Sequence, residues 1–178
     1  AGALGADGRN PWCLGAMTVA TLGGIFIFST LIGILTSGIE SKLDELRKGR
    51  SFVVESNHTI ILGWSTQVFP IISELVIANQ NRPRACIVVM AEVDKVMMED
   101  EIRARIPDTG KTRIVCRTGS PIDLNDLEMV NPGAARSIII LSNELGDPDS
   151  QVIKTILALT NSPDRRPEPY HIVAEIRD

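Results

Sequence analysis

Residues 58–64 of this 178-residue chain read HTIILGW, a short apolar run that ends in a turn containing glycine. A continuous apolar run of this length is typical of a strand that is covered on both faces. Four further runs follow along the chain. Together they give five predicted strands: HTIILGW (58–64), ACIVVMAE (85–92), TRIVCRTGS (112–120), RSIIILS (136–142) and HIVAEI (171–176).

Apolar residues at helical spacing predict helices between these strands, at residues 68–78, 95–105, 122–129 and 149–159. Alternation of strands and helices is the pattern of α/β proteins with a parallel sheet. Since crossovers between parallel strands are right-handed, we expect a Rossmann-like, doubly wound domain at residues 51–178 with strand order 3-2-1-4-5. The chain starts without methionine and stops at the last predicted strand, so we expect truncation at both ends.

Upstream of this domain, no charged residue lies between Arg9 and Glu40. Residues 12–39 exceed the roughly 20 apolar residues with which a helix crosses a bilayer, and they are too long for a signal-peptide core. We therefore predict a membrane helix at 12–39 and a helical linker at 40–50, with a buried soluble helix as the alternative. More Lys and Arg residues follow the helix than precede it, which places the C-terminal domain in the cytosol.

Composition argues against several classes of function. The formal net charge of −4 and the pI near 5.3 disfavour a nucleic-acid-binding protein. Three cysteines without a C-x-x-C pair disfavour a disulfide scaffold or a cysteine metal site. The segment Gly63-Trp64-Ser65 lacks the glycine two residues after the serine that a nucleophile elbow requires. We expect the chain not to be an enzyme.

The turn after the first predicted strand is where folds of this class bind ligands. Gly63 matches the first glycine of the dinucleotide fingerprint G-x-G-x-x-G, whereas Ser65 and Val68 replace the other two. Glu92, at the end of the second predicted strand, has the position of a ribose-binding carboxylate. Gly63, Ser65 and Glu92 are therefore candidate ligand-binding residues, and a solvated strand-end acid is the alternative for Glu92.

Three carboxylates, Glu144, Asp147 and Asp149, lie within six residues after the fourth predicted strand. Ca²⁺ prefers oxygen ligands, so a regulatory calcium site is one interpretation of this loop. Helix capping is the other, because Asp at a helix start is ordinary N-cap chemistry.

Small residues are frequent in and before the predicted membrane helix. Gly and Ala residues around a carboxylate just before the helix would suit a cation filter, although a plain linker fits equally well. Glycines within the helix weaken it locally and are candidate hinges, with ordinary membrane glycines as the alternative. The candidates are Ala6, Asp7 and Gly8 for the filter and Gly23, Gly24 and Gly33 for the hinges.

Several segments together resemble the Castor/Pollux ion-channel family. They are SGIESKLDELRKGRSFVVESNHTIILGWS (37–65), IANQN (77–81), CRTGSP (116–121) and the region 135–160. The block 46–65 is the most specific of these, because it joins the membrane exit to the first strand and its turn in one continuous pattern.

This resemblance implies a subunit of a homotetrameric, ligand-gated cation channel in a membrane, the plasma membrane if the source is bacterial. Residues 12–39 would line the pore, and residues 51–178 would form part of a cytosolic gating ring like those of regulators of potassium conductance. Residues 6–10 partly match the family's filter, and the acidic loop gains weight as a Ca²⁺ sensor. The implied partners are identical subunits, lipid and permeant cations. A membrane-anchored nucleotide-binding or oxidoreductase domain, and a regulatory subunit of a potassium transporter, stay open as alternatives.

Overall fold

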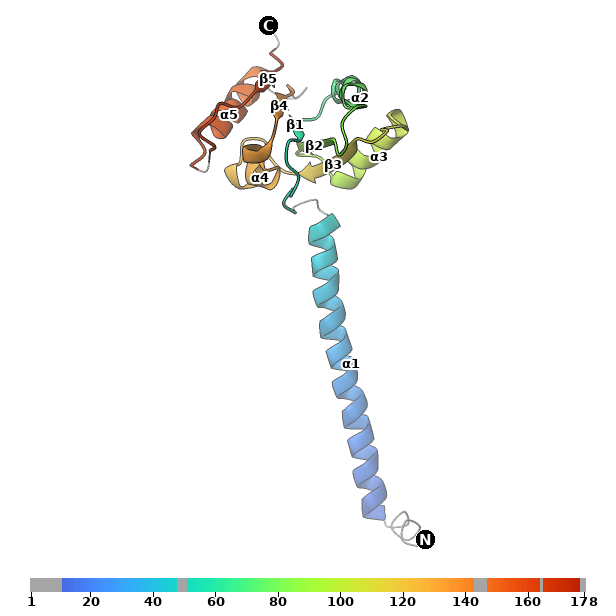
Figure 1. Ribbon diagram of the computed structural model, residues 1–178. Coiled ribbons are helices and arrows are strands. Elements are labelled where there is room, and N and C mark those ends of the chain that lie inside the picture. The colour runs from blue at the N-terminus through green and yellow to red at the C-terminus, as the bar shows by residue number, and fades with distance from the viewer. Residues whose placement is uncertain (1–10, 48–50, 143–146, 164, 177–178) are drawn as a thin grey trace. The chain divides into compact units, whose positions relative to one another are not determined.

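The computed structural model describes residues 11–47, 51–142, 147–163 and 165–176, and Figure 1 shows its helices and strands. The chain divides into two compact units, Ala1–Asp44 and Glu45–Asp178. We refer to the second as the sheet unit and describe each unit by itself.

The first unit is dominated by one helix, α1 (Pro11–Arg47). Its segment Gly15–Thr36 has a mean hydropathy of 2.0, and none of that apolar stretch is buried in protein, so it is long and apolar enough to cross a membrane. Two hydroxyls within it are satisfied inside the helix: Thr21 donates to the carbonyl of Met17 at 2.8 Å, and Thr30 donates to that of Phe26 at 2.9 Å. The segment Gly15–Thr36 is apolar on all sides, which is typical of a segment surrounded by lipid or by other chains.

The sheet unit contains five parallel strands in the order β3-β2-β1-β4-β5. This confirms the predicted order and fold class. The order follows from right-handed crossovers that run outward from β1, first to one side and then to the other. The strands are β1 (Thr59–Leu62), β2 (Cys86–Ala91), β3 (Arg113–Thr118), β4 (Ser137–Ile140) and β5 (Ile172–Ala174).

Helices cover both faces of this sheet, with α2 and α3 on one side and α4 and α5 on the other (Figure 1). Successive residues of β1 point to opposite faces, so Ile61 packs with α2 and α3 while Ile60 and Leu62 belong to the opposite core. The helices are α2 (Val68–Ala78), α3 (Lys95–Arg105), α4 (Leu124–Met129) and α5 (Pro148–Asn161), with a 3₁₀ turn at Pro132–Ala134.

Aspartates fix where three of the helices begin. The Asp94 carboxylate accepts hydrogen bonds from the N–H groups of Val96 and Met97 at the start of α3. Asp123 does the same for α4, which therefore begins at Leu124 and not at Ile122 as predicted. Asp147 caps α5. Such caps satisfy backbone donors that have no partner inside the helix.

Candidate functional site

The turn between β1 and α2 is held tightly between the neighbouring strands. Gly63 has φ +102°, and a Cβ atom at this position would lie 2.7 Å from the carbonyl oxygen of Leu141. The Gly63 N–H donates to the carbonyl of Met90 at 2.9 Å, and the Leu141 N–H donates to that of Leu62 at 2.8 Å. Both the positive φ and the close approach require glycine here.

The residues that replace the other two fingerprint glycines are used inside the fold. Ser65 is buried, and its hydroxyl accepts a hydrogen bond from the Gln67 N–H at 3.3 Å. Val68 is fully buried in the core beneath α2, and its N–H donates to the Ser65 carbonyl. Pro70 has no N–H at all. The start of α2 therefore offers a phosphate few free donors, and this turn fits a dinucleotide poorly.

Glu92 lies at the same edge of the sheet as Gly63. The β1–β2 register pairs Leu62 with Met90, so both residues follow directly at the carboxyl ends of neighbouring parallel strands. The Glu92 side chain is exposed. Its role as a ligand-binding carboxylate stays a prediction, as do those of Gly63 and Ser65.

A buried serine at this edge was missed by the sequence reasoning. Ser142, just after β4, is fully buried, and its hydroxyl has no hydrogen-bond partner within the described part of the chain. Its N–H donates to the carboxylate of Glu175 at 3.1 Å, and the Glu175 N–H donates to the Ile140 carbonyl at 2.9 Å. A buried hydroxyl without a partner is unfavourable, so Ser142 is a further polar group at the ligand-binding edge that sequence reasoning did not single out. The available signal was the serine that ends the apolar run 136–142.

The acidic loop is described only in part. Asp147 caps α5, where it accepts from both the N–H and the hydroxyl of Ser150, and these hydrogen bonds lower the pKa of its carboxyl. Asp149 lies in the first turn of the same helix, and Glu144 is outside the described residues. Among the residues that the structure describes, no three His, Cys, Asp or Glu side chains are grouped to hold a metal ion. The calcium site stays a prediction.

The pore candidates are also untested. Ala6, Asp7 and Gly8 lie outside the described residues. α1 continues as regular helix through Gly23, Gly24 and Gly33, and a Cβ atom at each of these three glycines would have no neighbour within 4 Å. Their role as hinges remains an expectation.

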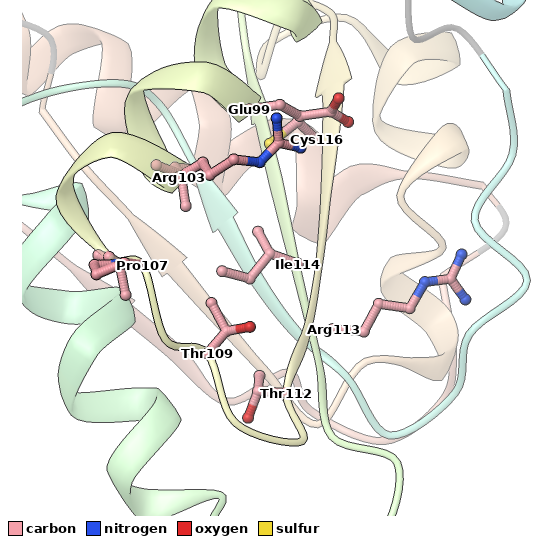
Figure 2. Close-up of a pocket in the computed structure, with 10 residues that line it drawn as sticks. Glu99, Arg103, Pro107, Thr109, Thr112, Arg113, Ile114 and Cys116 are labelled. Carbon is pink, nitrogen blue, oxygen red and sulfur yellow. The ribbon is translucent and has the colours of Figure 1, made fainter.

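A cavity of about 400 Å³ lies beside the edge strand β3, and Figure 2 shows Glu99, Arg103 and Cys116 together at one end of it. Arg113 is directed away from them, and its guanidinium is paired with Glu55 at 2.6 Å. Burial raises the pKa of the Cys116 thiol to about 12. The thiol is therefore protonated at neutral pH and is a poor nucleophile.

No family model matches the chain. The chain is 39% identical over 160 residues to a probable ion channel CASTOR of Oryza sativa, and 40% identical over 160 residues to the ion channel CASTOR of Lotus japonicus. It is 40% identical over 158 residues to a probable ion channel POLLUX of Arabidopsis thaliana. These matches cover 88% to 89% of this chain and confirm the resemblance to Castor/Pollux channels.

The chain spans only 18% to 19% of the length of these relatives. Among solved structures, it is similar to the RCK domain of GsuK, with 22% identity, a TM-score of 0.47 and coverage of 72% of this chain and 23% of that one. It is also similar to the GsuK channel bound to NAD, with 21% identity, a TM-score of 0.49 and coverage of 88% and 26%.

Proposed function

We propose that the chain is part of a ligand-gated cation channel, in which α1 crosses the membrane beside the ion path and the sheet unit regulates it from the cytosol. The observation that carries this proposal is the 39% to 40% identity to proteins named ion channels. The match covers 89% of the chain, whereas residues 45–178 are about three-quarters of it, so the similarity extends from the sheet unit into α1.

The exposed apolar surface of α1 supports its place in a membrane. None of the apolar segment Gly15–Thr36 is buried in protein, and Trp12 lies near the start of the helix, where an interfacial anchor is expected. One helix cannot enclose a path for ions by itself. Identical subunits, a homotetramer in this proposal, would supply the other walls. Ala16, Ala20 and Gly24 recur every four residues and would allow close approach between helices.

The chain between α1 and β1 supports mechanical coupling. The Ser51 carbonyl accepts from Arg117 Nε at 2.6 Å, the Val53 N–H donates to the Met129 carbonyl at 2.7 Å, and the Asn57 N–H donates to that of Ala134 at 2.8 Å. The sheet unit therefore holds the chain from residue 51 onward. Only three residues separate Ser51 from the end of α1 at Arg47. A connection this short would pass a movement of the sheet unit on to α1.

Gating requires a ligand that binds the open and the closed state with different affinity. Ca²⁺ at the acidic loop of Glu144, Asp147 and Asp149 is the regulatory ligand in this proposal, and Gly63, Ser65 and Glu92 form the second candidate position. Gly23, Gly24 and Gly33 would let the helix bend as it opens.

Current recording from lipid bilayers tests the proposal, with the protein carrying any flanking segments that its gene encodes. We expect cation currents whose open probability changes when Ca²⁺ is added on the side of the sheet unit. Asp147→Asn removes a charge but keeps the cap acceptor, so it should reduce the Ca²⁺ response without unfolding the domain. Asp100→Asn, an exposed change on α3, is the matched control and should leave the response unchanged.

Two outcomes would count against the proposal in different ways. Inserted protein that passes no ions in any condition would refute the channel. Currents with an unchanged Ca²⁺ response in both Asp147→Asn and Asp149→Asn would refute the sensor and leave the channel standing.

A further inference from the structure

A cavity of about 390 Å³ lies at the edge of the sheet opposite to the Gly63 turn, at the amino ends of the strands. Arg82 and Arg84 come just before β2, and Arg136 comes just before β4. We call this cavity the arginine pocket. Among the described residues that line it, none is acidic, although the chain as a whole carries a formal net charge of −4.

Within the part of the chain that the structure describes, no ion pair joins a guanidinium group of the pocket to a carboxylate. In the described ranges, the ion pairs are Lys95–Glu99, Arg103–Asp100 and Arg113–Glu55, and none of them includes an arginine of the pocket. Arg136 donates to the Thr59 hydroxyl at 3.2 Å, a neutral group. Arg82 and Arg84 are exposed and Arg136 is partly buried, and all three line one cavity. Like charges near one another repel. An anion in the cavity would relieve this repulsion.

Cys86 on the wall supplies no such negative charge. Burial raises the pKa of its thiol to about 11. The thiol is therefore neutral near pH 7 and adds no negative charge to the wall of the pocket.

A buried amide faces the same cavity. Asn79 is only 3% exposed and lines the arginine pocket. Its backbone N–H is bonded to the carbonyls of Leu75 and Val76. The side-chain amide carries both donors and an acceptor, so it adds a neutral polar group to the lining of a pocket that is otherwise rich in positive charge.

The backbone at the pocket is strained. Arg84 has φ +92° and Asn57, which also lines the cavity, has φ +57°. Glycine adopts such angles freely, whereas a residue with a long side chain is strained by about 1–3 kcal/mol. The strain at Arg84 therefore occurs in a residue that lines the cavity together with Arg82 and Arg136.

We propose that the arginine pocket binds a small molecule that carries phosphate groups. Guanidinium groups form paired hydrogen bonds with phosphate oxygens, and three of them match a multiply charged anion. The Asn79 amide would bind a hydroxyl or a further phosphate oxygen. The volume lies within the roughly 300–1,000 Å³ of small-molecule pockets. The site is at the opposite end of the sheet from the Gly63 turn and does not depend on the channel proposal.

Calorimetric titration of inositol trisphosphate into the full chain, held in phosphatidylcholine nanodiscs, tests this site. We expect saturable binding that weakens at least about tenfold in Arg84→Gly, the loss expected for one charge-assisted pair. Because glycine relieves the positive φ, the unfolding midpoint of Arg84→Gly should equal or exceed that of the unchanged protein. A loss of binding therefore cannot be attributed to misfolding.

Two further variants make the test specific. Lys111→Ala removes one exposed positive charge elsewhere in the sheet unit, and its affinity should stay within about twofold, because distant exposed charges are screened. Asn79→Leu removes the amide from the wall of the pocket and should weaken binding. Equal weakening in Lys111→Ala and Arg84→Gly would overturn the proposal, because binding would then reflect general charge.

The source of the phosphate is distinguished by a second probe. Vesicles of phosphatidylcholine with a minor fraction of phosphatidylinositol bisphosphate are compared with the soluble headgroup. Binding of the soluble headgroup identifies a free ligand, and Arg84-dependent binding to these vesicles alone identifies a lipid headgroup. Absence of Arg84-dependent binding to both probes would overturn the site.

Discussion

Two apolar segments of this chain have opposite surroundings. In β2 (Cys86–Ala91) every residue is buried, whereas none of the apolar segment Gly15–Thr36 of α1 is. A helix satisfies its own backbone groups and can stand alone in lipid, while a strand needs neighbours on both sides. β2 has these neighbours in β1 and β3. High hydropathy thus indicates that a segment is not exposed to water. Whether it is buried in protein or surrounded by lipid depends on how its backbone groups are hydrogen-bonded.

The largest effect is expected when a charge is placed in the buried strand. Val88→Asp places a carboxylate in a core position with no exposed surface, and we expect a loss of at least about 4 kcal/mol in the free energy of unfolding. Residues 45–178 should then lose cooperative unfolding, measured by circular dichroism during heating. Val54→Asp is the control, because Val54 is 94% exposed. Equal loss in both variants would contradict the assigned core.

The same change in the helix should act on a different property. Ile27→Asp, at a side chain that is 67% exposed, should disfavour membrane insertion by about 3 kcal/mol, or roughly a hundredfold. The unfolding midpoint of the sheet unit should not move. Glycosylation mapping of insertion provides the measurement, and Ile27→Leu should insert normally. A lower midpoint of the sheet unit in Ile27→Asp would mean that α1 is packed against protein.

A smaller loss of stability is expected at Gly63, at the edge of the sheet. A second glycine variant separates the cost of the close contact there from the cost of the positive φ angle. Gly63→Ala meets the Leu141 carbonyl at 2.7 Å and also has φ +102°, so we expect a loss of about 2–3 kcal/mol in unfolding free energy. Gly110→Ala is the matched control: its φ is +55° and a Cβ atom there has nothing within 4 Å, so about 1 kcal/mol should be lost. Urea denaturation measures both. Equal losses would show that the Leu141 contact contributes nothing.

The smallest expected effect is a dependence of stability on pH, caused by His58 just before β1. His58 is buried with its Nε2 bonded to the Val130 carbonyl at 2.9 Å, and its Nδ1 has no partner within the described ranges. Burial lowers the pKa of His58 below 6.5. The unfolded chain therefore binds a proton that the folded chain does not, and stability should fall as pH decreases below about 6.5.

Unfolding midpoints measured from about pH 7 to about pH 5 check this dependence. His58→Gln keeps a donor for the Val130 carbonyl but does not titrate in this range, so its midpoint should vary less. A variant with the same pH profile as the unchanged protein would exclude His58 as the source.

The fold was largely predictable from the sequence because its apolar runs are short, continuous and separated by helices of clear period. Both α2 and α3 begin and end at the predicted residues. The strands are shorter than predicted. β1 ends at Leu62 because Gly63, at φ +102°, turns out of the ladder. The start of α5 also differs, since Pro148 takes the first helical position and makes Asp147 the cap.

The site was predictable only where local sequence determines it. Gly63 follows directly from its strand, whereas Ser142 and Glu175 meet because β4 and β5 pair across 33 residues of sequence. The arginine pocket depends in the same way on β1 lying between β2 and β4, which brings Arg84 and Arg136 to one edge. No motif in a single segment marks such a site.

Two of the four threonines of α1, Thr21 and Thr30, have a consequence for how the helix would face an ion in the proposed channel. Each hydroxyl donates its hydrogen to a carbonyl of its own helix. The hydroxyl oxygen can therefore still coordinate a cation, but the hydroxyl has no hydrogen left to donate to an anion. Thr21 and Thr30 are nine residues apart, which is two and a half turns at about 3.6 residues per turn. Rotating α1 by half a turn about its long axis would therefore bring Thr30 to the side that Thr21 faced. The exposed hydroxyl oxygen would then lie at a different depth along the helix.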